Sequence, residues 1–256
     1  MLSQKLKIKL LKVCYSIYPK KITALLVKRD TDFPTFLKKN RLEKTNKYDR
    51  YKKNLIKSLK LLKKILGKEP FTVIKTISSY PHITSDLDVV VKNKILLEKL
   101  KKINFPIKTD INNRVSWTNG EEISRDFIWN NIQNYDFHGV KVLVPNTNLD
   151  VLIRMAHLPF EQAEIRLGEL LHLFKQFKNI NWRLLENEAK INGWPKTFKR
   201  VKKLLNQLHY SLFNSTKSIN FPYRLSWLLL IQSVIEKKAW KKIWGARYII
   251  KDRLLK

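Results

Sequence analysis

Three aspartates have the residue type and spacing best suited to chemistry. Asp86 and Asp88 are two positions apart and directly precede the apolar run Val89–Val91, and Asp110 follows further along the chain. Because side chains alternate across a strand, both carboxylates of the pair are expected on one face, while Leu87 and the alternate valines bury the other. Two carboxylates this close repel each other unless a cation lies between them. The pair therefore predicts a site for a hard cation, Mg²⁺ or Mn²⁺, carried in with phosphates, although a solvated start to a strand is the simpler alternative.

Asp110 lies in the segment FPIKTDINNRVSW, residues 105–117. Apolar and polar residues alternate there, which is typical of a half-exposed strand. If this strand lies beside the one that carries Asp86 and Asp88, three carboxylates converge. Such an arrangement holds two metal ions that activate an attacking oxygen and stabilise a departing pyrophosphate. A solvated aspartate on an exposed strand face remains the alternative.

The surrounding pattern predicts a small α/β core that positions these acids. A strand over 72–76 and a polar loop with Ser78 and Ser79 precede the paired acids. A helix over 42–66, with an apolar leucine face and Gly67 as its stop, comes before that strand. Further elements are predicted as helices over 93–102 and 121–131, a strand over 140–144, and a helix capped by Asn148 with Asp150 in its first turn.

The order of these signals resembles a known family. A phosphate-loop strand, the paired acids, and a strand with the pattern D-I-N-x-x-x-S-W are similar to the polymerase-beta-type nucleotidyltransferase superfamily. Within it, the chain resembles the uncharacterised nucleotidyltransferase family, on the phrases VKVLVPNTNLDVLIRMAH over 140–157 and INWRLLENEAKINGW over 180–194. The likeness covers roughly residues 70 to 195.

This resemblance implies a fold, an activity and a site. The fold would be α/β (α+β), a small mixed sheet flanked by helices, with a helical region over 1–66, a catalytic core over 67–148 and a C-terminal helical domain over 149–256. The activity would be transfer of NMP from an NTP to a hydroxyl, with Mg²⁺ or Mn²⁺ as cofactor. The implied catalytic residues and metal ligands are Asp86, Asp88 and Asp110, of which Asp110 would also act as base.

The implied nucleotide-binding residues lie at the phosphate loop. The superfamily's Gly-Ser falls near Lys75 and Thr76, and this chain has no glycine there. Hydroxyl and amide donors of Thr76, Ser78 and Ser79, together with the charge of Lys75, would then bind the phosphates. The missing glycine favours an alternative function, a non-catalytic nucleic-acid-binding protein on a decayed nucleotidyltransferase scaffold.

Charge indicates the class of partner. Lys and Arg number 52 against 21 acids, for a net charge of +31. Such an excess favours a polyanion, RNA above all, because neutralising phosphates releases counterions. Surface lysines without a specific partner are the alternative, and a peripheral membrane protein with a basic helix over 2–29 is a third hypothesis. The single Cys14 excludes an intramolecular disulfide, and without an evident signal peptide or long apolar run the chain is expected in the cytoplasm.

The C-terminal half offers weaker candidates. His157, among apolar neighbours, is interpreted as a buried core residue rather than a substrate contact. Glu161 is assigned either to a polar network near the cleft or to a solvated helix face. An apolar segment over 225–235 is predicted to be a buried helix too short to span a bilayer. Trp240, Trp244 and Tyr248 follow among cations, a pattern that suits either a helix core or stacking on single-stranded nucleic acid.

Overall fold

A mixed five-stranded sheet forms the centre of the molecule, in the order β3-β2-β1-β5-β4. This computed structural model describes residues 46–77, 86–118, 120–162, 173–174, 176–213 and 226–237. The parallel pairs are β2 with β3 and β1 with β5, while β1 with β2 and β4 with β5 are antiparallel. The predicted fold class, a mixed sheet flanked by helices, is confirmed. The strands are β1 (Phe71–Ile74), β2 (Leu87–Val91), β3 (Thr109–Asn112), β4 (Ile132–Phe137) and β5 (Val140–Pro145).

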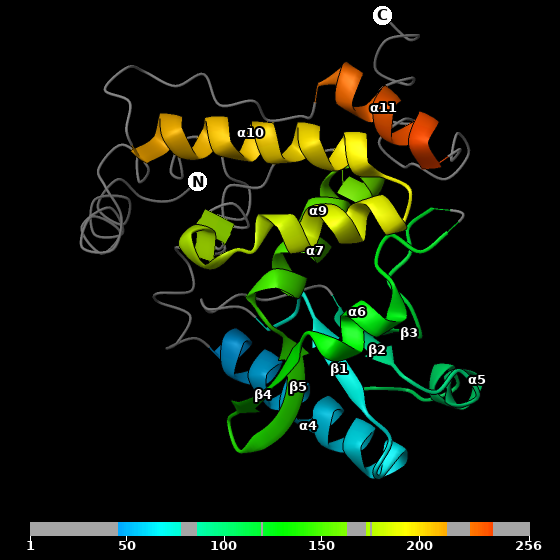
Figure 1. Ribbon diagram of the computed structural model, residues 1–256. Helices are drawn as coiled ribbons and strands as arrows, with labels where there is room; N and C mark the ends of the chain where they lie inside the picture. Colours follow the sequence, from blue (N-terminus) through cyan, green and yellow to red (C-terminus); the bar gives the residue numbers. More distant parts are fainter. Residues whose placement is uncertain are drawn as a thin grey trace, which may run out of the picture.

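One face of the sheet is covered by α4 (Asn46–Leu66), with α5 (Leu96–Lys101) beside β3 (Figure 1). The predicted leucine stripe of α4 is confirmed, because its members Leu55, Leu59, Leu62 and Leu66 are all buried. They pack in one cluster with residues of β1, β2 and β5 that point to this face. Gly67 ends α4 in a left-handed conformation, φ +59°, as predicted.

The other face carries a layer of helices that is continuous with the C-terminal bundle. Val90 of β2 and Ile74 of β1 belong to one core cluster together with buried residues of α7 and of the C-terminal helices. This cluster includes Trp194, just before α10, and Phe198 within it. In Figure 1, α10 lies across the top of this layer with α9 beneath it and α11 beside it. The helices of this layer are α6 (Arg125–Asn130), α7 (Thr147–His157), α9 (Trp182–Ile191), α10 (Pro195–Phe213) and α11 (Trp227–Lys237), with single turns at Leu158–Gln162 and Phe177–Asn179.

Several predicted boundaries were wrong. The strand over 72–76 ends at Ile74, because the backbone of Lys75 turns into the left-handed region. The strand over 105–117 is confined to Thr109–Asn112; Val115 instead forms an isolated bridge with Ile123. The helices over 93–102 and 121–131 shorten to α5 and α6.

The region around β4 and β5 holds two further differences. β4 was not predicted, because its side chains are mostly exposed and carry no apolar alternation. The cap of α7 is Asn146, whose side chain accepts from the Leu149 amide, whereas Asn148 accepts from the Asn181 amide. Asp150 does lie in the first turn of α7, as predicted.

The helix predicted over 225–235 corresponds to α11, which is buried on one side only. Leu229, Leu230 and Val234 are buried, whereas Leu228 and Ile235 are exposed. No helix in the described part of the chain is both long enough and apolar enough to span a bilayer. The basic segment over 2–29, the loop residues Ser78 and Ser79, and the aromatic stretch 240–248 lie outside the described residues.

Candidate functional site

The pairing of β2 with β3 brings two of the three predicted acids to adjacent positions. The strands run parallel with Asp88 opposite Asp110, and the Leu87 amide donates to the Lys108 carbonyl at 2.8 Å. Since the two residues share one register position, their side chains project from the same face of the sheet. Asp86 directly precedes β2. The sheet therefore gathers the predicted acids at the ends where β2 and β3 begin.

The turn after β1 lies against the same place, because β1 is the antiparallel neighbour of β2. Ile74 pairs with Asp88, and the next residue, Lys75, has φ +52°. Thr76 closes the turn because its amide donates a hydrogen bond to the Ile74 carbonyl, and its buried hydroxyl accepts from the Asp88 amide at 3.0 Å. A positive φ is a conformation that favours glycine. Lys75 thus adopts a left-handed turn that glycine usually occupies, and Thr76 joins this turn to β2.

The side chain of Lys75 points into the acid site. Its Nζ lies 3.4 Å from Asp88 Oδ2, 3.8 Å from Glu161 Oε2 and 3.4 Å from His157 Nε2. The indole of Trp117 lies below it, with 5.6 Å between Nζ and the ring centroid. Only 16% of the Lys75 side chain is exposed. The ammonium therefore lies within a shell built from β2, from the end of α7 and from the loop after β3.

His157 reaches this shell as the last residue of α7, and Glu161 reaches it from the π-helix that continues α7, Leu158–Gln162. Pro159 has no amide hydrogen to donate to the previous turn, which favours a wider turn at this point. The imidazole Nε2 of His157 contacts the Glu161 carboxylate, and the His157 ring lies 5.4 Å from that of Trp117. The other ring nitrogen, Nδ1, is buried and has no hydrogen-bond partner among the described residues.

The carboxylates of the site differ in how readily they ionise. Burial raises the pKa of Asp88; Lys75 lowers it, and the charges of Asp86 and Asp110 raise it further. Glu161 behaves in the opposite way. Burial opposes its ionisation, yet hydrogen bonds from His157 and Trp117 and the charges of His157 and Lys75 lower its pKa to about 2. The site thus holds one firmly ionised carboxylate and one acid under repulsion from two others.

The chemistry of the acidic donors fits a divalent cation. Carboxylate oxygens are the ligands that Mg²⁺ prefers, and the repulsion on Asp88 is relieved by added positive charge. In the present arrangement Lys75 supplies that charge. Asp110 is exposed, and its Oδ1 accepts from Asn112 Nδ2 at 3.1 Å. Among the described residues no three acidic, histidine or cysteine side chains are close enough together to hold an ion.

Sequence reasoning left Trp117 out of the site, interpreted His157 as a core residue, and assigned Glu161 to a polar network near the cleft only as one of two alternatives. His157 is buried, as predicted, but it borders the acid site rather than a purely apolar core. The spacing of four residues between His157 and Glu161 was the available signal, since it puts both on one side of a helix. Nothing in the sequence marked Trp117 beyond its place at the end of the D-I-N-x-x-x-S-W pattern.

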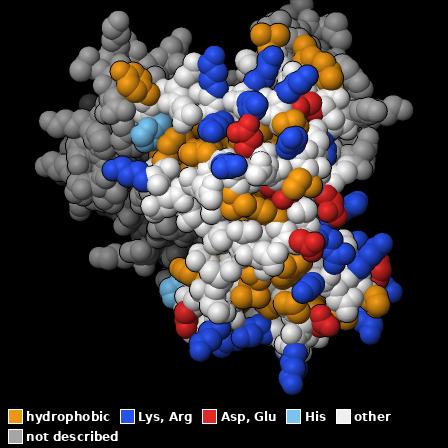
Figure 2. Space-filling view, viewed as in Figure 1, with side chains coloured by type: hydrophobic (Ala, Val, Ile, Leu, Met, Phe, Trp, Pro, Cys, Tyr) orange, Lys and Arg blue, Asp and Glu red, His pale blue; other side chains and the backbone are white. Residues whose placement is uncertain are grey.

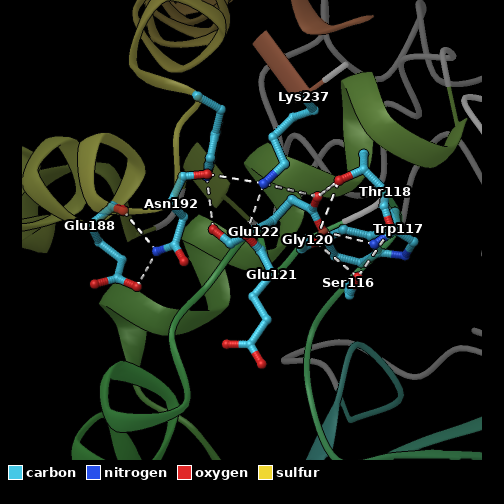
Figure 3. A network of polar contacts seen from close by, with 10 residues as sticks. Ser116, Trp117, Thr118, Gly120, Glu121, Glu122, Glu188, Asn192 and Lys237 are labelled. Carbon is cyan, nitrogen blue, oxygen red and sulfur yellow. Dashed lines mark hydrogen bonds and ion pairs between the residues drawn. The ribbon is translucent and has the colours of Figure 1, made fainter. Parts of the chain in front are cut away.

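A second polar cluster holds the loop that carries Trp117 (Figure 3). Glu122 is fully buried, and its carboxylate accepts from the Trp117 amide at 2.7 Å and from the Thr118 hydroxyl. Lys237 of α11 lies 3.6 Å from the same carboxylate and donates to the carbonyls of Glu121 and Asn192 at 2.9 and 3.0 Å. This cluster therefore ties the Trp117 loop to α11 and to the end of α9.

Comparison with known proteins added nothing to this picture: no protein-family model, curated protein or solved structure matched the chain. Any functional conclusion depends on the residues and contacts described above.

Proposed function

We propose that the protein is a metal-dependent nucleotidyltransferase that moves NMP from an NTP to a hydroxyl acceptor and releases pyrophosphate. The observation that carries the proposal is the register of β2 and β3, which pairs Asp88 with Asp110 beside the Lys75–Thr76 turn. Acids at the ends of neighbouring strands, next to a left-handed turn after a third strand, are an arrangement able to accept a triphosphate with its counter-cations.

In the proposed reaction the acceptor oxygen attacks the α-phosphorus. The bond from the α-phosphorus to its bridging oxygen breaks, pyrophosphate leaves with that bonding pair, and the hydroxyl proton passes to Asp110. Asp110 suits this role because it is exposed to solvent at the edge strand, where an acceptor can approach. Bound Mg²⁺ or Mn²⁺ would neutralise phosphate charge. Asp86, Asp88 and Asp110 would hold the ion after their side chains draw closer together than they lie here.

The remaining residues of the site would bind and orient the nucleotide. The ammonium group of Lys75 lies beside Asp88, and its side chain extends from the turn after β1. Thr76 is buried and bonded to the Asp88 amide, so its contribution would be to hold the turn rather than to contact phosphate. Trp117, partly buried beside Lys75, offers an aromatic face to a base or sugar.

The acceptor that the charge favours is RNA. Lys and Arg outnumber acids by 52 to 21, and on the face in Figure 2 they are spread over both the helical layer and the sheet layer. A dispersed positive surface attracts phosphate backbones without selecting a sequence. The proposal therefore names RNA as the acceptor class and leaves its sequence open.

The experiment incubates the protein with Mg²⁺ or Mn²⁺, each α-labelled NTP in turn, and total cellular RNA. The test variant carries Asp86→Asn and Asp88→Asn. A matched control carries Asp126→Asn and Glu98→Gln, which remove the same two charges from exposed positions on α6 and α5. Label should move to RNA with the native protein and the control variant, and not with the test variant.

Two results would contradict the proposal. If no label reaches RNA, protein or any other hydroxyl, there is no transferase activity. If the test variant transfers label as well as the control does, the activity does not depend on the acid pair.

A second candidate, a non-catalytic nucleic-acid-binding protein on the same scaffold, is favoured by one observation. Lys75 already neutralises Asp88, as expected of a site that no longer needs a metal ion. This candidate predicts that RNA binding occurs without transfer and is equal in the test variant and the control. It also predicts no rise in melting temperature on adding Mg²⁺ with an NTP.

A further inference from the structure

The position of Lys75 has a consequence for how a cation can enter the acid site. Its ammonium has three polar neighbours, on Asp88, His157 and Glu161, at 3.4 to 3.8 Å. Charge-assisted hydrogen bonds are normally closer, roughly 2.7 to 2.9 Å. Lys75 therefore lies among these groups without a short bond to any of them.

Lys237, in the cluster around Glu122, is by contrast a lysine held in place by short hydrogen bonds. Its ammonium donates to two carbonyls at 2.9 and 3.0 Å in addition to facing Glu122. Among the described residues, no backbone carbonyl accepts a hydrogen bond from the Lys75 ammonium. The Lys75 side chain also has a flexible four-carbon stem, so it can change partners without movement of the backbone.

The same ammonium competes directly with any cation at Asp88. Asp88 is the acid that pairs with Asp110 across the strands, and Lys75 lies 3.4 Å from its Oδ2. A divalent cation bound at that oxygen would face a positive charge at close range, which is unfavourable in a partly buried site. A triphosphate changes the balance, because its oxygens offer the ammonium a new and more highly charged partner.

We propose that Lys75 makes the acid site selective for a metal–triphosphate complex over the free metal ion. Without nucleotide, Lys75 occupies the place of the counter-cation at Asp88; with nucleotide, its ammonium transfers to the phosphates and releases Asp88. The identity of the ligand rests on the proposed function. The competition between Lys75 and a cation does not.

The test measures Mn²⁺ binding to the full chain by the electron paramagnetic resonance signal of free Mn²⁺, without nucleotide. Lys75→Met removes the ammonium and keeps the β-carbon, so the backbone at this position stays under the same constraint. Lys92→Met is the matched control, because Lys92 is exposed just beyond the opposite end of β2 and lies over the Trp129 ring. Lys75→Gln is a second variant, and melting temperatures verify that each protein is folded.

We expect both Lys75 variants to bind Mn²⁺ about tenfold more tightly than the native protein, because one nearby positive charge has been removed. Lys92→Met should bind as the native protein does. Adding a non-hydrolysable NTP analogue should tighten Mn²⁺ binding to the native protein, and this gain should be much smaller in the Lys75 variants. Equal Mn²⁺ affinity in native and Lys75 variants, or no Mn²⁺ binding in any of them, would overturn the inference.

The outcome is distinguishable from that of the proposed function. Tighter Mn²⁺ binding in the Lys75 variants, with no label transferred by the native protein, would retain the competition and reject the transferase. Label transfer by the native protein, with unchanged Mn²⁺ affinity in the Lys75 variants, would retain the transferase and reject the role of Lys75.

Discussion

Two lysine–carboxylate clusters, Lys237 with Glu122 and Lys75 with Asp88, are built in opposite ways. Burial raises the pKa of both carboxyl groups. At Glu122 this is opposed by hydrogen bonds from Thr118 and the Trp117 amide and by Lys237. At Asp88, Lys75 alone among the described residues opposes it, while Asp86 and Asp110 add repulsion.

This difference separates a carboxylate whose charge is compensated by short contacts within the protein from one whose charge is compensated only in part. The Glu122 cluster satisfies its charges within the protein, and it fixes the loop that carries Trp117. The Asp88 cluster keeps unbalanced negative charge beside a lysine with long contacts. Protein stability should depend on the first cluster and ligand binding on the second.

The largest effect is expected from Glu122→Ala. The change leaves Lys237 and the Trp117 amide without their carboxylate in a buried place, so the free energy of unfolding should fall by about 3 kcal/mol. Urea unfolding measures it. Glu121→Ala is the control, because the Glu121 side chain extends away from the network and only its backbone carbonyl takes part (Figure 3). A loss no larger than that of the control would mean that the Glu122 cluster does not stabilise the fold.

Asp88→Asn should have a much smaller effect on stability. The variant removes a charge that burial and two neighbouring acids disfavour, so the free energy of unfolding should change by no more than about 1 kcal/mol. The difference in free energy of unfolding between the variant and the native protein depends on pH. The folded-state pKa of Asp88 is raised above 3.8, so the stability that this group contributes to the native protein is lost as pH rises through the folded pKa. The variant should therefore gain on the native protein with rising pH. If Asp88→Asn lowered the free energy of unfolding as much as Glu122→Ala does, both clusters would stabilise the fold equally and the proposed difference between them would be wrong.

The two clusters also differ in how far the sequence could predict them. Strand alternation and element order are local signals, and they suffice to anticipate that β3 lies beside β2 with Asp88 opposite Asp110. The close approach of all three predicted carboxylates is not found among the described residues. Glu122 was not predicted, since its partners Thr118, Lys237 and the Trp117 amide meet only through long-range packing of α11. His157 was assigned to the core from its apolar neighbours, whereas the structure places it at the end of α7 beside Lys75, with Glu161 of the following π-helix.

Substitution of Lys75 by Gly and by Met separates the backbone from the charge at this site. Both variants remove the ammonium, but glycine alone relieves the constraint of φ +52°. Lys75→Gly should therefore be about 1 kcal/mol more stable than Lys75→Met in urea unfolding. The same pair of changes at Lys203, exposed on α10, should give the reverse order, because glycine destabilises a helix interior. If glycine is the less stable residue at both positions, the turn is not strained.

The smallest effect concerns Glu161, whose side chain is 42% exposed. Its folded-state pKa of about 2 lies below the ordinary 4.5, so its contribution to stability is complete above 4.5 and is lost as pH falls toward 2. The native protein should exceed Glu161→Gln in stability at neutral pH, and the gap should close through that window. Solvent screening at this exposure keeps the gap small. Glu98→Gln, on the exposed side of α5, supplies the baseline, and a carboxyl NMR titration of Glu161 gives the midpoint directly. A midpoint near 4.5 would mean that neither His157 nor Lys75 acts on this carboxylate. Glu161 would then not belong to the group of side chains that surrounds the Lys75 ammonium.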